Sequence, residues 1–368
     1  MKVLITGANG FIGKNLRLHL SERKDLQVLC FTRSDDVAQL LVMLQDVDFV
    51  FHLAGVNRPK DKAEFSSGNT GLTEQLCDAI RATGRQIPVV YTSSIQAETA
   101  NLYGESKLAS ENVLIALERD TRSPVYLYRL ANVFGKWSKP NYNSAVATFC
   151  FNTANNLPIQ INDPSALIRL VYVDDVIKDL LQLLDARPVG VLRPRVFPEY
   201  SITVGGLADQ LIAFKTSQDS MCIESVGVGL TRALFSTYLS FLRPEQFSYT
   251  VSAHADARGR FVEMLKTKDS GQFSFFTAHP GVTRGGHYHH SKNEKFLVIQ
   301  GKARFGFRHI ETDETYEIFT DSVKPEVVQT VPGWSHDIKN IGDNEMIVML
   351  WANEIFNQAH PDTITYKV

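Results

Sequence analysis

The sequence predicts an α/β domain built on a doubly wound parallel sheet, followed by an all-β barrel. From residue 1 to about 243, short apolar runs rich in β-branched residues alternate with amphipathic stretches, which is the βαβ pattern of a parallel sheet. From about residue 250 that alternation ends, and short strands follow one another between Gly, Pro, Asn and Asp turns. Proline and polar residues interrupt the pattern at 242–248. We therefore expect two domains, at 1–243 and 250–368.

Composition permits two domains and argues against several classes of protein. The chain has 368 residues, 44% of them hydrophobic, and a formal net charge of -2, so it can bury two cores and has no excess charge to attract a nucleic acid or an acidic membrane surface. No apolar run is long enough to span a bilayer, and the N-terminus shows no signal-peptide features. We expect a soluble cytoplasmic protein whose four scattered cysteines are reduced and structural.

The predicted elements follow from the period of the apolar residues. Five β-rich runs are expected to form the parallel strands, namely Lys2–Thr6, Gln27–Thr32, Phe49–Ala54, Val89–Ser93 and Val125–Leu130. The amphipathic stretches Thr70–Thr83 and Lys107–Asp120 are expected to be helices between them. In the C-terminal region we expect strands at Gly271–Ala278, Glu294–Gln300, Ala303–His309, Tyr316–Phe319, Val327–Val331 and Ile347–Ala352.

A glycine-rich loop follows the first predicted strand. Gly7, Gly10 and Gly13 stand in the spacing Gly-x-x-Gly-x-x-Gly, with Phe11 and Ile12 between the last two. The loop opens a helix, so backbone amides at the helix N-terminus can meet a pyrophosphate that no bulky Cβ keeps away. Because strand, loop and helix come in this order, we predict a Rossmann-like fold that binds a dinucleotide.

The ends of later strands bear on the choice of cofactor. The second strand is followed by Arg33, where a site for NAD usually has an acidic residue for the ribose hydroxyls. An arginine suits the 2′-phosphate of NADP instead, which predicts NADPH; the alternative is that Arg33 is only a solvated arginine. Ala54 and Gly55 end the third run and are small enough for an adenine-ribose to pack closely, although an ordinary strand end would explain them nearly as well.

A second motif is typical of a proton donor for carbonyl reduction. Ser94 ends the fourth strand, and Tyr103 and Lys107 stand four residues apart at the start of a helix. Residues four apart share one face, so the Lys107 ammonium can lower the pKa of the Tyr103 phenol while the serine hydroxyl binds the same substrate oxygen. A Tyr-x-x-x-Lys pair alone is often a surface pair, but here it follows a glycine loop and a strand ending in two serines.

These motifs resemble the extended short-chain dehydrogenase/reductase family, whose members mostly act on nucleotide sugars. Arg129–Gly135 and Val171–Val176 are two further segments typical of that family, and the resemblance covers about residues 1–240. It implies that Ser94, Tyr103 and Lys107 form the catalytic trio. Ser94 and Tyr103 are only nine residues apart, where extended members usually carry a longer insertion, so we expect an unusually open substrate rim.

Four of the ten histidines fall in two short C-terminal motifs. On a strand His287 and His289 project to one face and His290 to the other, while Glu294 begins the adjacent strand and His336 lies on a distant strand that a barrel can bring opposite. Three imidazoles and a carboxylate suit zinc, or else iron, manganese or nickel. We predict one divalent ion per chain, zinc before the others, held by Glu294, His336 and one or two of the three neighbouring histidines.

The stretches 286–301 and 332–340 resemble both motifs of the cupin superfamily, which implies a jelly-roll barrel. Arg284–Tyr288 also resembles the Arg-Gly-x-His-Tyr stretch of deoxysugar epimerases with that fold, whose histidine removes a sugar-ring proton next to a keto group. The two resemblances assign different roles to His287. A metal-bound imidazole cannot be the base; if His287 is the base, the metal is left with His289 or His290, Glu294 and His336.

Two departures from the epimerase pattern favour a metal in this site. The lysine of the metal-free epimerases falls on Glu294 here, and their later acid tyrosine has no obvious counterpart. Lys295 should face the opposite side of its strand, and Tyr288 is expected to pack outward. We therefore expect a metal to replace the lysine as the stabiliser of the enolate. The spacing from His287 through Glu294 to Gly301 favours the ligand role for His287.

The whole chain resembles the bifunctional enzymes of capsular polysaccharide synthesis that join an extended reductase to a metal-binding cupin. The resemblance implies that the cupin domain epimerises a UDP-4-keto-6-deoxy-N-acetylhexosamine at C3. The reductase domain then reduces C4 with NADPH to a UDP-2-acetamido-2,6-dideoxy-L-talose, on the way to UDP-N-acetyl-L-fucosamine. We expect a UDP-sugar substrate, no nucleic-acid or membrane partner, and a homo-oligomer, either a dimer or a tetramer.

Two other interpretations remain open at this point. The cupin could act as a ketoisomerase or only hold the substrate beside a reductase. An alternative from another class is a regulatory protein that binds NADP and a sugar without turnover. The trio of Ser94, Tyr103 and Lys107 argues against a sensor, which has no need of a proton donor.

Overall fold

The computed structural model describes residues 1–368 apart from 59–60, 291, 324–325 and 360. Its contacts divide the chain into two compact units, one of Met1–Leu211 with Val228–Leu242 and one of Ile212–Gly227 with Arg243–Val368. The sequence predicts that 212–227 belongs to the first domain, whereas the structure groups this segment with the C-terminal unit. The reason is strand β10 (Cys222–Ile223), which pairs in parallel with β12 (Gly259–Thr267). In the part of the chain that is described, no helix is long and apolar enough to cross a membrane.

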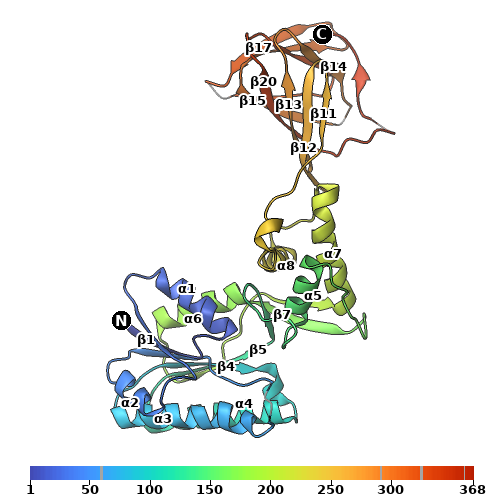
Figure 1. The fold of residues 1–368 in the computed structure, drawn as a ribbon. Coiled ribbons are helices and arrows are strands. Elements are labelled where there is room, and N and C mark those ends of the chain that lie inside the picture. The colour runs from blue at the N-terminus through green and yellow to red at the C-terminus, as the bar shows by residue number, and fades with distance from the viewer. Residues whose placement is uncertain (59–60, 291, 324–325, 360) are drawn as a thin grey trace. The chain divides into compact units, whose positions relative to one another are not determined.

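The N-terminal unit contains the predicted parallel sheet, sandwiched between helices (Figure 1). Its strand order is β2-β1-β3-β4-β5-β8. The strands are β1 (Lys2–Thr6), β2 (Gln27–Phe31), β3 (Phe49–His52), β4 (Val89–Ser94), β5 (Val125–Leu130) and β8 (Val191–Leu192). One face is covered by α2 (Ala38–Leu44), α3 (Leu72–Thr83) and α4 (Leu102–Thr121), and the other by α1 (Phe11–Ser21) and α6 (Val173–Ala186). The doubly wound α/β fold predicted from the sequence is confirmed.

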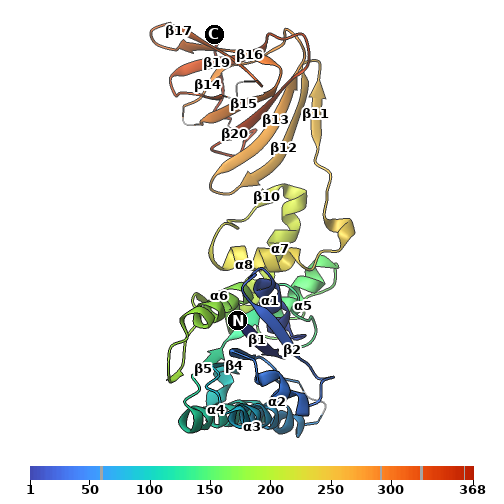
Figure 2. The same cartoon turned by 90° about the vertical axis from the view of Figure 1, so that its left-hand side faces the viewer.

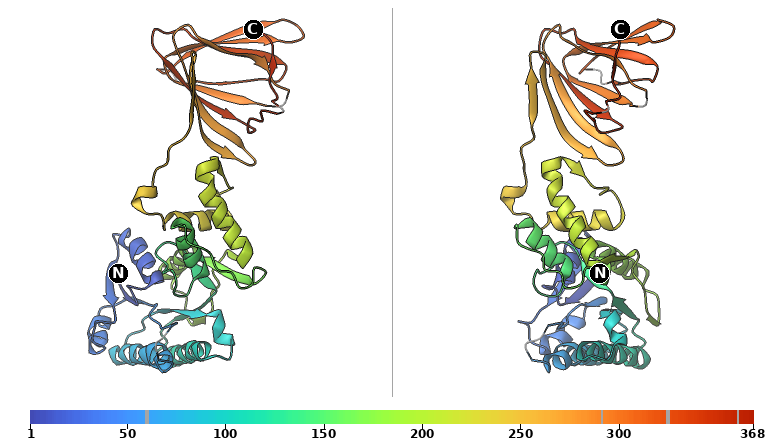
Figure 3. Two further views of the ribbon diagram at one scale, coloured as in Figure 1. Left: turned by 45° about the vertical axis from the view of Figure 1, so that its right-hand side comes forward. Right: turned by 90° about the vertical axis from the view of Figure 1, so that its right-hand side faces the viewer.

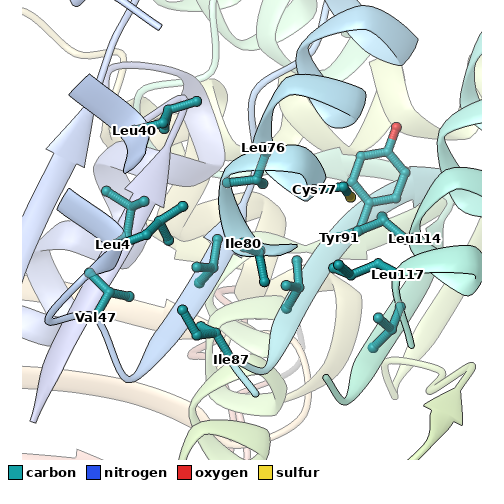
Figure 4. Packing of buried hydrophobic residues seen from close by; sticks show 14 of the residues in the cluster. Leu4, Leu40, Val47, Leu76, Cys77, Ile80, Ile87, Tyr91, Leu114 and Leu117 are labelled. Atoms are coloured by element: carbon teal, nitrogen blue, oxygen red, sulfur yellow. The ribbon is translucent and has the colours of Figure 1, made fainter. Parts of the chain in front are cut away.

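The sheet and the helices α2, α3 and α4 are held together by one apolar cluster (Figure 4). Leu76 and Ile80 lie four residues apart on α3, so both point at the sheet, where they meet Leu4 and Tyr91. Each of these side chains is completely buried, and full burial of such a side chain stabilises a fold by about 1.5–3 kcal/mol. α3 ends at Gly84, whose φ of 66° makes the left-handed turn that stops the helix.

Smaller elements complete this unit. A three-stranded sheet has the order β6-β7-β9, with bounds Asn132–Phe134, Leu167–Tyr172 and Glu199–Thr203. The helices α5 (Ala145–Ala154), α7 (Val204–Ser220) and α8 (Gly229–Leu239) follow in the chain, with the last turns of α7 belonging to the second unit. The sequence analysis does not predict α7 or α8, because neither has the strong apolar periodicity that identifies α3.

The C-terminal unit consists of two β-sheets that face each other across a shared core (Figures 2 and 3). The larger sheet has the order β10-β12-β13-β20-β15-β18, and β11 pairs with β12. The bounds of β10 and β12 are given above. The other strands of this sheet are β11 (Ala253–Asp256), β13 (Gly271–Ala278), β20 (Met346–Ala352), β15 (Glu294–Gln300) and β18 (Val327–Gln329). The smaller sheet has the order β17 (Thr315–Asp321), β16 (Lys302–His309), β19 (Trp334–Asn340), β14 (Thr283–Tyr288) and β21 (Ile364–Thr365). This is the all-β, jelly-roll type of fold that the sequence predicts.

The core between the two sheets leads to a prediction about the free energy of unfolding of the C-terminal unit. Phe305 on β16 is 1% exposed, whereas Phe319 on the neighbouring β17 is 61% exposed. Phe305→Ala should lower the free energy of unfolding of the C-terminal unit by about 3–5 kcal/mol, because it removes buried surface and leaves a cavity. Phe319→Ala should change it by no more than about 0.5 kcal/mol. Denaturant titration of the two variants measures the difference, and equal effects would contradict the assignment of the core.

Candidate functional site

The glycine loop is shaped so tightly that two of its glycines cannot be replaced. Gly7 has a φ of 72°, and a Cβ there would lie 2.6 Å from the backbone nitrogen of Ala54. A Cβ on Gly13 would lie 2.3 Å from the Gly7 carbonyl oxygen. The loop therefore lies against the end of β3, and α1 begins at Phe11 with Gly10 as its N-cap and no side chain capping its first turn. Of the predicted residues, Gly7 and Gly10 already donate their backbone N–H groups to the Phe31 and Gly7 carbonyls, at 3.1 and 2.9 Å. The predicted pyrophosphate site therefore depends on the first turn of α1, which contains Phe11, Ile12 and Gly13.

Strand order explains why the loop meets Ala54. β1 has β2 on one side and β3 on the other, so the chain winds in opposite directions from β1. The carboxyl ends of β1 and β3 then border a crevice, which is where open α/β sheets bind their ligands. Predicted cofactor residues from both strands are thus brought to one edge of the sheet.

Arg33 is exposed beyond the end of β2. The nearest following acid, Asp35, is engaged in the turn, because its carboxylate accepts from the Thr32 backbone N–H at 2.7 Å and from the Thr32 hydroxyl at 2.8 Å. The Asp35 carboxylate is therefore held by Thr32, and the exposed Arg33 guanidinium lies in the same turn as the exposed Asp36.

Lys107 is the most constrained of the predicted catalytic residues. Its side chain is buried, and Nζ donates a hydrogen bond to the Thr92 carbonyl at 2.9 Å. Burial lowers the pKa of Lys107, while the charges of Tyr103 and Glu111 act in the opposite direction. A Cβ on Gly55 would lie 3.1 Å from Nζ, so the ammonium lies directly behind the predicted cofactor crevice.

Tyr103 and Ser94 lie at the same edge, at the start of α4 and the end of β4. Asn101 caps α4 by accepting from the Gly104 backbone N–H at 2.8 Å. Gly104 has no room for a side chain, since a Cβ would lie 2.1 Å from the Gln96 carbonyl oxygen in the 3-10 turn Ile95–Glu98. Ser94 caps that turn by accepting from the Gln96 N–H at 3.2 Å. The 3-10 turn therefore joins the end of β4, which carries Ser94, to the start of α4, which carries Tyr103 and Lys107.

Two polar side chains that are not predicted from the sequence, those of Asn69 and Glu111, support this edge of the sheet. Asn69 is buried in a π-helical turn (Ser66–Gly71), where its amide contacts both backbone groups of Val56 at 2.8 and 3.0 Å and the Ser106 hydroxyl at 2.9 Å. A Cβ on Gly55 would lie 3.0 Å from its Oδ1. Single-turn π segments often mark functional sites, but an asparagine in a polar run gives no sequence signal of one.

A buried carboxylate holds the strand that carries Ser94. Glu111 accepts a hydrogen bond from the Ser93 hydroxyl at 2.5 Å, and Arg129 binds both of its oxygens, with contacts of 2.9 and 2.6 Å. Arg129 also donates to Glu98 at 2.7 Å. These bonds join α4, β4, β5 and the 3-10 turn, and they explain why an arginine begins the segment 129–135 that is typical of the reductase family.

In the C-terminal unit, His287, His289, Glu294 and His336 form one cluster, with ligand atoms that all lie within 4.8 Å of one another. His289 Nε2 and His336 Nε2 lie 3.1 and 3.3 Å from Glu294 Oε2. A bulge in β14, with positive φ at Gly285 and Gly286, brings His287 opposite His336 on β19. The two predicted motifs therefore meet as expected.

The four residues of this cluster fit a divalent ion. Atoms at about 2.0–2.1 Å from a tetrahedral ion are about 3.3 Å apart, close to the spacings around Glu294. His336 Nδ1 is buried without a hydrogen-bond partner, and His289 Nδ1 is hydrogen-bonded to the Asp362 carbonyl, which leaves His289 Nε2 for a ligand bond.

The electrostatics of the cluster also suit a metal. Burial, assisted by the other two histidines, lowers the pKa of His287 to about 4, so its imidazole is neutral at pH 7. Burial alone would raise the pKa of Glu294, but hydrogen bonds from His289 and His336 lower it well below its usual range. Neutral imidazoles and an ionised carboxylate are the forms that bind metals.

His290 does not join this cluster. It is exposed, its ring packs against Tyr288 with a centroid distance of 5.5 Å, and its backbone N–H donates to the Asp362 carboxylate at 2.8 Å. The alternation of side chains along the chain from His287 explains the difference. Of the three neighbouring histidines, the structure brings His287 and His289 to the site.

Comparisons with known proteins cover both units. Residues 3–193 match the model of the NAD dependent epimerase/dehydratase family, and residues 254–364 match the polysaccharide biosynthesis C-terminal domain. A Pseudomonas aeruginosa protein described as UDP-2-acetamido-2,6-beta-L-arabino-hexul-4-ose reductase is 59% identical over 368 residues, which are 100% of this chain and 99% of the relative.

One solved structure matches both units and another matches part of the chain. The capsular polysaccharide assembling protein CapF from Staphylococcus aureus is 40% identical, has a TM-score of 0.92, and matches over 100% of both chains. A UDP-glucuronic acid 4-epimerase from Bacillus cereus, solved with NAD, matches 66% of this chain and 98% of its own with a TM-score of 0.56; at 19% identity it shows the fold alone. The chain therefore belongs to the NAD dependent epimerase/dehydratase family, among the members that continue into a polysaccharide biosynthesis C-terminal domain.

Proposed function

We propose that this chain is a bifunctional nucleotide-sugar enzyme of capsular polysaccharide synthesis. Its C-terminal cupin unit epimerises a UDP-4-keto-6-deoxy-N-acetylhexosamine at C3. Its N-terminal unit then reduces the C4 ketone with NADPH, which yields UDP-2-acetamido-2,6-dideoxy-L-talose. The substrate class follows the full-length relative, which is described as a reductase of a UDP-linked 4-ulose.

One observation carries the reductase half of the proposal: the buried Lys107 ammonium one helical turn from Tyr103, at the sheet edge that also holds the glycine loop. The Tyr103 hydroxyl gives its proton to the C4 keto oxygen as hydride adds to C4. Lys107 stabilises the phenolate that remains, and the Ser94 hydroxyl donates to the same substrate oxygen. Bound NADPH would supply the hydride.

The epimerase half rests on the cluster of three imidazoles and one carboxylate. A C4 ketone makes the hydrogen on C3 acidic, since the electron pair left behind is shared with the keto oxygen. A divalent ion held by His287, His289, Glu294 and His336 would supply positive charge for that oxygen. The close grouping of the His287 ring with the other three supports its role as a ligand rather than as the base.

The product assay tests the whole proposal. Purified protein is incubated with NADPH and candidate UDP-4-keto sugars, and the product is identified by NMR. A product with inverted C3 and a reduced C4 is expected. A product reduced at C4 with C3 unchanged for every candidate sugar would contradict the epimerase half.

Tyr103→Phe should abolish NADPH oxidation, because it removes the hydroxyl that protonates the keto oxygen. Exchange of the C3 hydrogen with deuterium should continue, since that chemistry uses the other unit. Tyr316→Phe is the matched control, because Tyr316 is an exposed residue of β17. Stopped-flow absorbance at the NADPH band and NMR in D2O measure the two reactions. Reduction by Tyr103→Phe at near the wild-type rate would show that the assignment is wrong.

Arg33→Asp should narrow or reverse a preference for NADPH over NADH. A charge-assisted contact to the 2′-phosphate is worth about 1.5–3 kcal/mol, or roughly 10- to 150-fold in affinity. Calorimetric titration of both cofactors into wild type and variant measures the effect. Equal affinities in the wild type would rule out the proposed preference.

Glu294→Ala and His336→Ala should each lower metal content and the melting temperature of the C-terminal unit, while the N-terminal unit stays folded. An ion at 100 times its dissociation constant stabilises the folded state by about 2.7 kcal/mol, and this is lost with the site. His290→Ala should keep the metal, because His290 lies outside the cluster. His287→Asn should lose metal and deuterium exchange together; retention of metal with loss of exchange would make His287 the base. Elemental analysis beside the exchange assay measures both.

A further inference from the structure

A cavity of about 260 Å³ opens beside the metal-ligand cluster, within the C-terminal unit. Glu294 and Lys292 line it on one side, and Glu263 and Gln272 line it from β12 and β13. Its volume is near the lower end of the range for small-molecule sites. Because Glu294 belongs both to this cavity and to the cluster, a sugar ring bound here would lie next to the metal ligands.

Strand pairing determines which side chains face the cavity. Gln272, Ala352 and Glu294 stand directly opposite one another on β13, β20 and β15, so they project from the same face of the sheet. Glu263 is opposite Ser274, two residues further along β13, and therefore projects from that face too. Glu263 and Glu294 are separated by two intervening strands, β13 and β20, and both residues line the cavity.

The proposed epimerisation needs a proton acceptor that the metal ligands do not provide. An imidazole nitrogen bound to a metal cannot accept a proton, and the Glu294 carboxylate belongs to the same set of ligands. The amide of Gln272 is not a base, and the Lys292 ammonium lies 3.6 Å from Glu294 Oε1, where it offsets that charge. Two other carboxylates line the cavity, those of Glu263 and Glu354.

Glu263 is the better positioned of these two carboxylates. It lies on a strand, whereas Glu354 lies in the segment that follows β20. A bulge between Glu263 and Leu265 brings Lys266 to the same face, although residues three apart on a regular strand face opposite sides. The Lys266 ammonium then lies 2.9 Å from Glu263 Oε2. One carboxylate oxygen is thus held in position, and the other can face a ligand.

We propose that Glu263 is the base of the C-terminal site. Its carboxylate takes the proton from C3, the C–H electron pair forms the C3–C4 double bond, and the keto oxygen takes up the negative charge. A proton from water then adds to the opposite face of C3 as the ketone re-forms, and Glu263 gives its proton to solvent. The ring is isomerised with no net change in protons or electrons. This inference rests on the proposed epimerisation.

The test compares Glu263→Gln with a matched control in the full-length, metal-loaded protein. Glu224→Gln is that control, because Glu224 also pairs with a lysine, Lys268 at 2.7 Å, and belongs to the same unit but does not line the cavity. Deuterium exchange at C3 of a UDP-4-keto-6-deoxy-N-acetylhexosamine is followed by NMR. We expect Glu263→Gln to slow exchange about 100-fold or more, as loss of a general base does, with metal content and melting temperature unchanged. Glu224→Gln should exchange like the wild type.

Chemical rescue separates a proton acceptor from a residue that only shapes the cavity. Formate is small enough to replace the missing carboxylate in Glu263→Ala, and it should raise the exchange rate at least 10-fold in a concentration-dependent way. Formate should not change the rate of Glu224→Ala. Rescue by formate would support the assignment, as a structural role would give none.

Other outcomes would overturn the assignment in distinct ways. Near wild-type exchange in Glu263→Gln would leave the epimerase function standing and reject Glu263 as its base. Loss of metal in Glu263→Gln would mean that Glu263 supports the structure of the metal-ligand cluster and is not the base. A wild-type protein that catalyses no exchange would reject the epimerisation itself, and this assignment with it.

Discussion

The chemistry proposed for the N-terminal unit depends on a positive charge buried at the carboxyl edge of the sheet. An ammonium group loses several kcal/mol of hydration when it is buried, so it persists only where other groups replace the water. Around Lys107 these are the Thr92 carbonyl at the end of β4 and the Tyr91 ring, whose centroid is 4.6 Å from Nζ. Close packing against Gly55 requires a residue without a side chain. The edge of the sheet that holds Lys107 therefore requires glycine at position 55, and the same edge carries Ser94 and Tyr103.

The C-terminal unit also buries polar groups, but there the groups contact one another. Three imidazoles and a carboxylate gathered within 4.8 Å would be costly if they were buried without partners. Contacts of His289 Nε2 and His336 Nε2 with Glu294 Oε2, at 3.1 and 3.3 Å, satisfy part of this demand. A divalent ion would turn this arrangement into a stable site. A cavity borders this cluster at Glu294.

The two proposed reactions belong together for a chemical reason. A ketone at C4 is required for the hydrogen at C3 to be removed, and the same ketone accepts hydride in the second step. Once C4 is reduced, the C3 hydrogen is no longer acidic, so the new configuration is kept. One chain that carries both sites can thus complete an epimerisation that would otherwise remain reversible.

The sequence by itself determined the features that depend on local pattern. Alternating apolar runs predicted the parallel sheet, and the spacings of glycine, tyrosine, lysine and histidine predicted the residues around which both sites are built, because strand and helix periods decide which neighbours share a face. Only the tertiary structure decided what depends on distant contacts. It excluded His290 from the cluster, brought 212–227 to the C-terminal unit through a two-residue strand, and revealed Asn69 and Glu111, whose partners lie in other elements. It also placed Glu263 on the lining of the cavity. A buried polar residue is recognised by its partners, and a single sequence does not show which distant residues those are.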